Sequence, residues 1–217
     1  MHAIKTGTLF DPAITRSVAS SLKTYFGTHG RIPFVCDSVY VSDYGVVLSR
    51  NDVHTIVKEL FPLAPVITLR ESDAQYLLNI EGQHLKIASL YDMLVAAQKL
   101  LTLGPRAVLL KGGKTAVSLN DILTVNVPND ASLEIQSDFP LGDNIEILRF
   151  IKSLEIKDHA VDVLCRRKRG AITFTLYPRL GLKSTNMQGA DATLSAALAC
   201  ALGNRIPGNG FLRISIP

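Results

Sequence analysis

Residues 87–113 read IASLYDMLVAAQKLLTLGPRAVLLKGG, a long amphipathic segment followed by a Gly-Pro break, a short apolar run and two glycines. Apolar residues recur every three or four positions, which predicts a helix over Ile87–Leu103 that ends at Gly104-Pro105. The run Arg106–Lys111 then predicts a buried strand that ends at Gly112-Gly113. A helix joined by a tight turn to a fully apolar strand is typical of a parallel sheet covered by helices.

The same alternation of strand and helix patterns runs through the residues before this stretch. Pro12 stands at the head of the first helical pattern, where its missing N–H costs nothing. The predicted elements are, in order, a strand at Ala3–Thr6, a helix at about Ala13–Phe26, a strand at Ile32–Cys36, a helix at Asp52–Phe61, a strand at Val66–Thr68 and a helix at Ser72–Leu78. Together they predict an α/β fold with a mostly parallel sheet and helices on both faces, in three layers.

The pattern weakens after the second glycine. Thr115–Asp158 is polar and poorly periodic, so we expect a loop or insertion there, apart from a helix at about Asn144–Leu154. Two apolar runs, Ala160–Cys165 and Ala171–Leu176, predict a hairpin. A glycine-led turn then opens a helix of small residues that reaches Gly203.

Composition excludes several classes of protein. The chain has 217 residues, of which 47% are hydrophobic and 19% charged, so it is neither disordered nor built around a membrane span. The three cysteines are far apart and form no C-x-x-C pair, which indicates a reducing compartment, free core thiols and no zinc site. We therefore expect a cytoplasmic protein without a membrane partner.

The formal net charge is +4, and the one dense basic cluster is Arg166–Arg169. One interpretation is a nuclear address or a nucleic-acid patch. The other is a solvated turn between the two hairpin strands. Because no aromatic residues are interleaved with the basic ones and the chain has no tryptophan, the turn is favoured and no nucleic-acid partner is expected.

Polar or glycine residues follow four of the predicted elements, at the edge where open parallel sheets bind ligands. They are Asp37, the segment Thr68–Asp73, the segment Lys111–Lys114 and the junction Gly189–Ala192. The junction is the most suggestive, because a helix start presents free backbone N–H groups and the positive end of the helix dipole to a phosphate. Each of the four alone is also compatible with an ordinary turn or cap.

In order, these segments resemble one known family over most of residues 3–203. The similar motifs are V-K-x-G-M-L at Ala3–Leu9, V-x-D-P-V-M-V at Val35–Val41, V-L-x-K-G-G-H at Val108–Lys114, V-D-V-L at Val161–Leu164 and G-T-G-C-T-L-S-A-A-I-A at Gly189–Ala201. The family is that of the hydroxymethylpyrimidine/phosphomethylpyrimidine kinases of thiamine synthesis, in the ribokinase-like superfamily. The resemblance implies a ribokinase-like domain over residues 3–203, incomplete at its N-terminus, with an unassigned tail at 204–217.

The resemblance also implies an activity: two phosphoryl transfers from ATP, with Mg²⁺, to a pyrimidine alcohol and then to its monophosphate. Backbone N–H groups would hold the phosphate, and a base would remove the alcohol proton. The implied positions are an anion hole at Gly189 and Ala190, nucleotide and phosphate contacts at Lys111, Gly112, Gly113 and Asp37, and a metal residue at Asp73. Family members are commonly homodimers.

Several positions depart from the family pattern. The family's cysteine, a catalytic acid/base candidate, aligns with Ala192, which has no proton to exchange. Asp191 stands one residue earlier and is the candidate substitute base, although a misplaced carboxylate there would repel phosphate. The family's N-x-x-E becomes Arg70-x-x-Asp73, with a cation where an amide helped to organise the metal.

The family also has a glycine-rich stretch and a substrate-binding glutamine before the first motif, which residues 1–2 do not supply. Three hypotheses remain open: a kinase whose pattern has drifted, a non-catalytic relative that binds nucleotide or a partner, and an incomplete gene product. A pyridoxal-type kinase is the alternative for the substrate.

Overall fold

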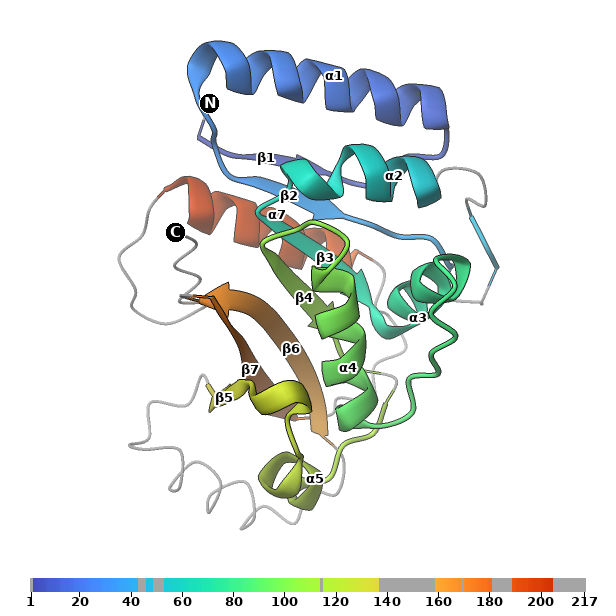
Figure 1. The fold of residues 1–217 in the computed structure, drawn as a ribbon, viewed down its shortest axis with the longest axis vertical. Helices are drawn as coiled ribbons and strands as arrows, with labels where there is room; N and C mark the ends of the chain where they lie inside the picture. The colour runs from blue at the N-terminus through green and yellow to red at the C-terminus, as the bar shows by residue number, and fades with distance from the viewer. Residues whose placement is uncertain are drawn as a thin grey trace.

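The computed structural model describes residues 2–42, 46–48, 53–113, 115–136, 159–168, 170–180 and 189–204. Their centre is one seven-stranded sheet in the order β1-β2-β3-β4-β6-β7-β5 (Figure 1). The strands are β1 (Ile4–Thr6), β2 (Phe34–Asp37), β3 (Val66–Arg70), β4 (Ala107–Lys111), β5 (Ser132–Ile135), β6 (His159–Lys168) and β7 (Ala171–Leu180). Strands β1 to β4 are parallel, and β6 turns the sheet antiparallel at β4.

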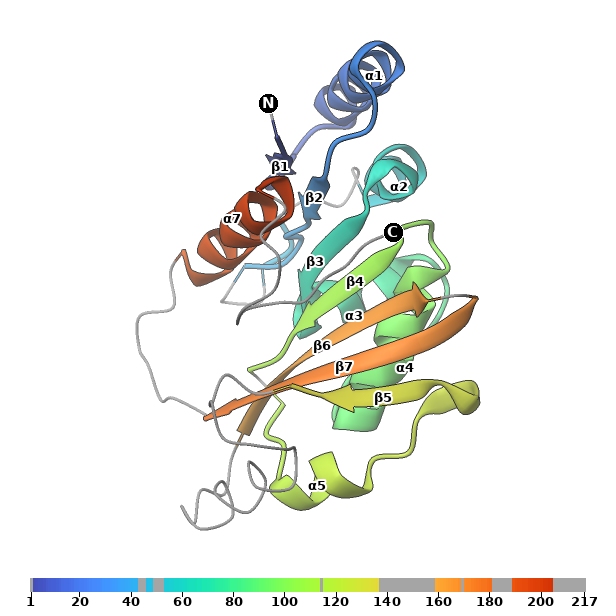
Figure 2. The ribbon, with the colours of Figure 1, turned by 90° about the vertical axis from the view of Figure 1, so that its left-hand side faces the viewer.

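Helices cover both faces of this sheet. The described helices are α1 (Pro12–His29), α2 (Val53–Glu59), α3 (Glu71–Ile80), α4 (Leu90–Leu101), α5 (Leu119–Thr124) and α7 (Ala190–Gly203), with short 3-10 helices at Phe61–Leu63 and Pro128–Asp130. Figure 2 shows α7 on one side of the sheet and α2, α3 and α4 on the other. Helix α1 packs on α2. The predicted three-layer α/β architecture is confirmed.

The strands alternate their side chains between two cores, as a period of two requires. Phe34 and Cys36 of β2 face the larger core beneath α2, α3 and α4, whereas Val35 faces the smaller core beneath α7. In β4, Leu110 faces the larger core and Leu109 the smaller one. The polar residues that follow on the α7 side of each strand therefore lie under α7.

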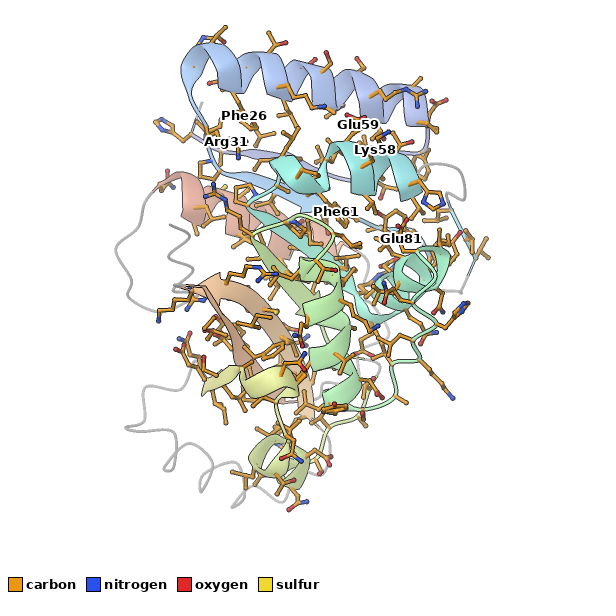
Figure 3. The ribbon with its side chains drawn as sticks, in the orientation of Figure 1. Phe26, Arg31, Lys58, Glu59, Phe61 and Glu81 are labelled. Atoms are coloured by element: carbon orange, nitrogen blue, oxygen red, sulfur yellow. The ribbon has the colours of Figure 1, made fainter. Side chains whose placement is uncertain are left out.

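Local signals explain where the helices begin. Asp11 caps α1 by accepting a 2.6 Å hydrogen bond from the Ala13 N–H, and Ser89 caps α4 by accepting from the Asp92 N–H. A salt bridge of 2.7 Å between Lys23 and Glu59 joins α1 to α2, and Figure 3 labels Glu59 on the side of α2 that faces α1. Predicted and observed helix bounds differ by up to three residues where the ends were read from apolar spacing alone.

The expectation of a loop over residues 115–158 was wrong in its first part. Ser118 and Asp121 form a reciprocal capping box that starts α5. Ser132–Ile135 then forms β5 and pairs parallel with β7. Both elements are too short for apolar periodicity to reveal. The helix predicted at residues 144–154 lies outside the described residues, as do residues 205–217 of the tail.

The basic cluster is not the hairpin turn itself. Arg166, Arg167 and Lys168 belong to the end of β6, and Arg166 is buried. The turn lies at Gly170, whose φ of 86° is left-handed. The predicted hairpin is confirmed, and Arg167 and Lys168 are exposed beside its turn, as the turn interpretation expects, although both still belong to the ladder with β7, which extends to Lys168↔Ala171.

Two cysteines match the prediction of core thiols and one does not. Cys36 and Cys165 are buried, whereas Cys200 lies exposed on α7. Burial raises the pKa of the Cys165 thiol to about 12, because the apolar surroundings disfavour the thiolate. Among the described helices, none is both long and apolar enough to cross a membrane.

Candidate functional site

The parallel strands bring polar side chains together at their carboxyl ends, on the face that α7 covers. Val35, Val66 and Leu109 fill the small core beneath α7. Two residues further along each strand stand Asp37, Thr68 and Lys111 on the same face, all buried. The sequence thus places apolar residues under the body of α7 and polar residues under its first turns.

Asp37 is the centre of this group, with only 3% of its surface exposed. Its Oδ1 accepts hydrogen bonds from Thr68 Oγ1 at 2.7 Å and from Lys111 Nζ at 3.3 Å. Its Oδ2 lies 3.5 Å from Lys5 Nζ. These three donors hold the Asp37 carboxylate at a fixed position.

Helix α7 is joined to the same carboxylate. Ser195 Oγ lies 2.7 Å from Asp37 Oδ2, and the serine is fully buried. Ser195 stands one turn after Asp191, whose carbonyl is 3.0 Å from the same hydroxyl. The bond to Asp37 therefore fixes how the first turn of α7 sits over the strand ends.

Asp191, in that first turn, lies between two cations. Its Oδ1 is 3.1 Å from Lys111 Nζ, and its Oδ2 is 3.5 Å from Arg70 Nε. Lys111 is 5% exposed and Asp191 35%, so this ion pair joins a buried ammonium to a carboxylate at the surface of the site. Asp191, the predicted base, therefore directly contacts Lys111, the residue predicted to bind phosphate.

Asp73 is engaged on both oxygens and has no exposed surface. Its Oδ1 accepts from the backbone N–H groups of Tyr40 and Val41 at 2.7 and 2.8 Å, and its Oδ2 accepts from Arg70 Nε at 2.8 Å. Arg70 also donates to the Val41 carbonyl. Asp73 and Arg70 thus tie the segment after β2 to the start of α3.

The glycines after β4 are held by two carboxylates. The Gly112 N–H donates to Asp162 Oδ1 at 2.8 Å, and the Gly113 N–H donates to Glu71 Oε1 at 2.9 Å. A Cβ at Gly112 would lie 2.1 Å from the Val161 carbonyl oxygen, so only glycine fits there. These bonds fix the end of β4, and with it Lys111.

The Gly189 junction has the geometry of an anion site. Gly189 is left-handed, with a φ of 84°, and caps α7 without a side chain. The N–H groups of Ala190, Asp191 and Ala192 are first-turn groups, which have no acceptor within the helix. Ala192 contributes an exposed methyl group and no proton donor or acceptor.

The described residues do not fit a protein-held Mg²⁺ ion. Mg²⁺ prefers carboxylate oxygens with room for its own waters, but Asp73 is fully engaged and Asp191 faces two cations. Within the described ranges, no group of three or more His, Cys, Asp and Glu side chains could hold a metal ion. The assignment of Asp73 as a metal-binding residue stays a prediction. In the structure, the cation that contacts its carboxylate is the Arg70 guanidinium.

Sequence reasoning found Asp37, Lys111 and Asp191, and the structure brings these three together. It did not single out Lys5, Ser195, Glu71 or Asp162 as site residues. The sequence does contain a feature that points to Ser195: it is a polar residue on the otherwise apolar face formed by Leu194, Leu198 and Ala199 of α7. The other three depend on contacts between elements distant in sequence, which spacing alone does not show.

Comparison with known proteins supports the motif resemblance. A family profile described as "Phosphomethylpyrimidine kinase" matches residues 1–139. The hydroxymethylpyrimidine/phosphomethylpyrimidine kinase of Synechococcus elongatus is 36% identical over 113 residues, which are 52% of this chain and 39% of that protein. A Schizosaccharomyces pombe protein, provisionally named hydroxymethylpyrimidine/phosphomethylpyrimidine kinase 2, is 34% identical over 203 residues, 93% of this chain and 30% of its own length.

Solved structures show the same fold. A phosphomethylpyrimidine kinase from Clostridium difficile 630 superposes with a TM-score of 0.59 at 24% identity, covering 95% of this chain and 62% of that one. A Bacillus subtilis pyridoxal kinase, solved as an ADP complex, gives a TM-score of 0.61 at 21% identity, covering 95% of this chain and 59% of that one. The chain spans less than two thirds of each of these relatives. The family profile, matched over more than half of the sequence, places this chain in the phosphomethylpyrimidine kinase family.

Proposed function

We propose that this protein uses ATP to phosphorylate hydroxymethylpyrimidine and then its monophosphate. Family membership supports the reaction class, and the solved neighbours include a Staphylococcus aureus pyridoxal kinase with ADP and with AMP-PCP. The observation that carries the proposal is the Asp191–Lys111 ion pair of 3.1 Å at the start of α7. Phosphoryl transfer needs a phosphate-binding cation and a base close together, and Lys111 and Asp191 are the residues that we propose for these two roles.

In this proposal the first-turn N–H groups of α7 hold the transferring phosphate, since helix N-termini bind anions. Lys111 neutralises charge on that phosphate, and Asp37 fixes the position of Lys111. Asp191 accepts the proton of the alcohol as the alcohol oxygen bonds to the γ-phosphorus. The bond from that phosphorus to the bridging oxygen breaks at the same time and releases ADP.

The glycines after β4 take an indirect part. Because the N–H groups of Gly112 and Gly113 already donate to Asp162 and Glu71, they shape the loop beside the nucleotide phosphates. We propose no residue of the described chain as a magnesium ligand, because both oxygens of Asp73 already accept hydrogen bonds and Asp191 faces two cations.

An ADP-release assay tests this reading with hydroxymethylpyrimidine as substrate and pyridoxal in a parallel reaction. Asp191→Asn removes the base while keeping the side chain's size, so turnover should fall at least a hundredfold, the usual order of a general-base contribution. Asp92→Asn, in the first turn of α4, is the matched control. Wild-type turnover equal to that of the Asp191→Asn variant would refute Asp191 as base; turnover with pyridoxal alone would move the substrate to the pyridoxal class.

A second candidate is a nucleotide-binding relative without turnover. It is favoured by Ala192, which offers no proton-transferring group, and by the two cations that hold Asp191. Calorimetry with ADP separates the two: binding together with turnover supports the kinase, and binding without turnover supports this alternative.

The remaining expectations belong to the same proposal. We assign residues 3–203 to the kinase-like domain and 204–217 to a tail, and we expect a cytoplasmic homodimer with no nucleic-acid partner. Sedimentation equilibrium of the purified chain measures the dimer, and a monomer at micromolar concentration would contradict it.

A further inference from the structure

Arg70 occupies the position from which a bound cation would reach the acidic side chains of the site. Its Nε lies 2.8 Å from Asp73 Oδ2 and 3.5 Å from Asp191 Oδ2, so one guanidinium edge serves two carboxylates. The arginine side chain is 16% exposed and Asp73 is fully buried. The positive charge next to these carboxylates is therefore built into the chain.

The Asp191 carboxylate also marks a place where an oxyanion fits. Its two oxygens meet Lys111 at 3.1 Å and Arg70 at 3.5 Å. A phosphate oxygen beside that carboxylate would contact the same two cations and the first-turn amides of α7. Arg70 would then face the anion with a charge that does not titrate at any ordinary pH.

A divalent ion at this place would be repelled. Asp73 has no oxygen to spare, because three donors already occupy its carboxylate. Lys111 and Arg70 would lie within a few ångströms of the divalent ion, and the Coulomb repulsion between like charges in a partly buried site would weaken its binding. The side chains at this place therefore favour binding of a metal-free phosphate and disfavour binding of a divalent metal ion.

We propose that the Arg70 guanidinium replaces the divalent ion at this site, so that the protein binds nucleotide phosphates in their metal-free form. The proposal rests on the nucleotide binding of the proposed function and specifies the ligand's form. Arg70 is thus a specificity-determining residue: it lets the protein bind free ADP or ATP without the magnesium ion.

Calorimetric titration with ADP, in excess MgCl₂ and separately in EDTA, tests it. The wild-type Kd in EDTA should be no more than about threefold weaker than in MgCl₂, a free-energy difference below one tenfold step. Arg70→Asn should weaken binding in EDTA at least tenfold, and MgCl₂ should restore part of the loss. Arg70→Lys keeps the charge and should retain binding in EDTA.

Arg31→Asn is the matched control, because it removes an exposed arginine that precedes β2 (Figure 3), whereas the site residue Asp37 lies at the other end of that strand. It should change neither Kd. Wild-type binding that requires MgCl₂ would overturn this inference and leave the proposed kinase standing. Absence of ADP binding in both buffers would overturn both. If Arg70→Asn does not fold, the wild-type comparison and Arg70→Lys still decide between these outcomes.

Discussion

The Ser195 hydroxyl lies 2.7 Å from Asp37 Oδ2, so α7 and β2, which are 158 residues apart at this contact, are joined by one buried hydrogen bond. The bond does two things. It supplies a donor to a carboxylate that is almost out of contact with water, and it sets the height of the α7 first turn above Lys111.

Ser195→Ala removes that donor and should destabilise the protein by about 1–3 kcal/mol, the usual cost of leaving a buried polar group under-satisfied. Urea unfolding followed by circular dichroism measures the loss. Thr193→Ala is the control on the same helix, because Thr193 is exposed and its hydroxyl donates only to the Gly189 carbonyl. Equal destabilisation by both variants would show that the Asp37 bond has no special role.

Gly112→Ala should be more damaging than its size suggests. The new Cβ would lie 2.1 Å from the Val161 carbonyl oxygen, so β4 and β6 must separate locally. Overpacking of this kind costs about 1–3 kcal/mol or more, and it would also move Lys111, the neighbouring residue.

The matched variant is Gly27→Ala, in α1, where an added Cβ meets nothing within 4 Å. It should stabilise the protein by up to about 1 kcal/mol, because alanine is the better helix former. Thermal melts of both variants measure the difference. A Gly112→Ala protein as stable as wild type would contradict the close approach.

The fold was predictable where local patterns are long, and the site only in part. The helix of residues 90–101 and its following strand β4 have both periodicity and end signals, so they were found. Strand β5 has four residues and lies at the edge of the sheet, where its pairing with β7 rather than its composition makes it a strand. Short elements of this kind depend on tertiary contacts.

The same distinction separates the site residues. Asp37 and Lys111 stand at strand ends, which a linear pattern reveals. The role of Glu71 depends on its contacts with Gly113 and Thr115, more than forty residues away. The pairing of Asp191 with Arg70 likewise depends on the packing of α7 against β1 and β2, which brings its first turn close to the end of β3. Motif spacing identifies the family well, but it does not show which charges face one another.

The buried Cys165 thiol should make the free energy of unfolding fall as the pH becomes alkaline. Burial raises its pKa from an ordinary 9.0 to about 12 in the folded state, so the unfolded chain loses this proton first as pH rises. Its stabilising effect is therefore complete below pH 9.0 and is lost between pH 9.0 and about 12, by about 1.4 kcal/mol per pH unit.

Urea unfolding at pH 8 and at pH 10 measures this loss, and Cys165→Ala is the reference, since its alkaline loss contains every other titrating group but not this thiol. Wild type should lose more stability than the variant over that interval. A thiol reagent at pH 8 gives a second reading: Cys200 is exposed and should react quickly, while Cys165 should react only on unfolding. Parallel pH profiles would contradict the raised pKa.

Asp191→Asn should bind ADP more tightly than wild type, because the Asp191 carboxylate competes with phosphate for Lys111 and Arg70. Removing one negative charge a few ångströms from the ligand in a partly exposed site should improve Kd by about three- to tenfold, and the gain should shrink as salt is added. Calorimetry at low and high ionic strength measures both effects, with Asp92→Asn as the control helix-start carboxylate. Weaker binding by Asp191→Asn would show that Asp191 orients the ligand rather than competing with it, and would place the phosphate elsewhere than between these two cations.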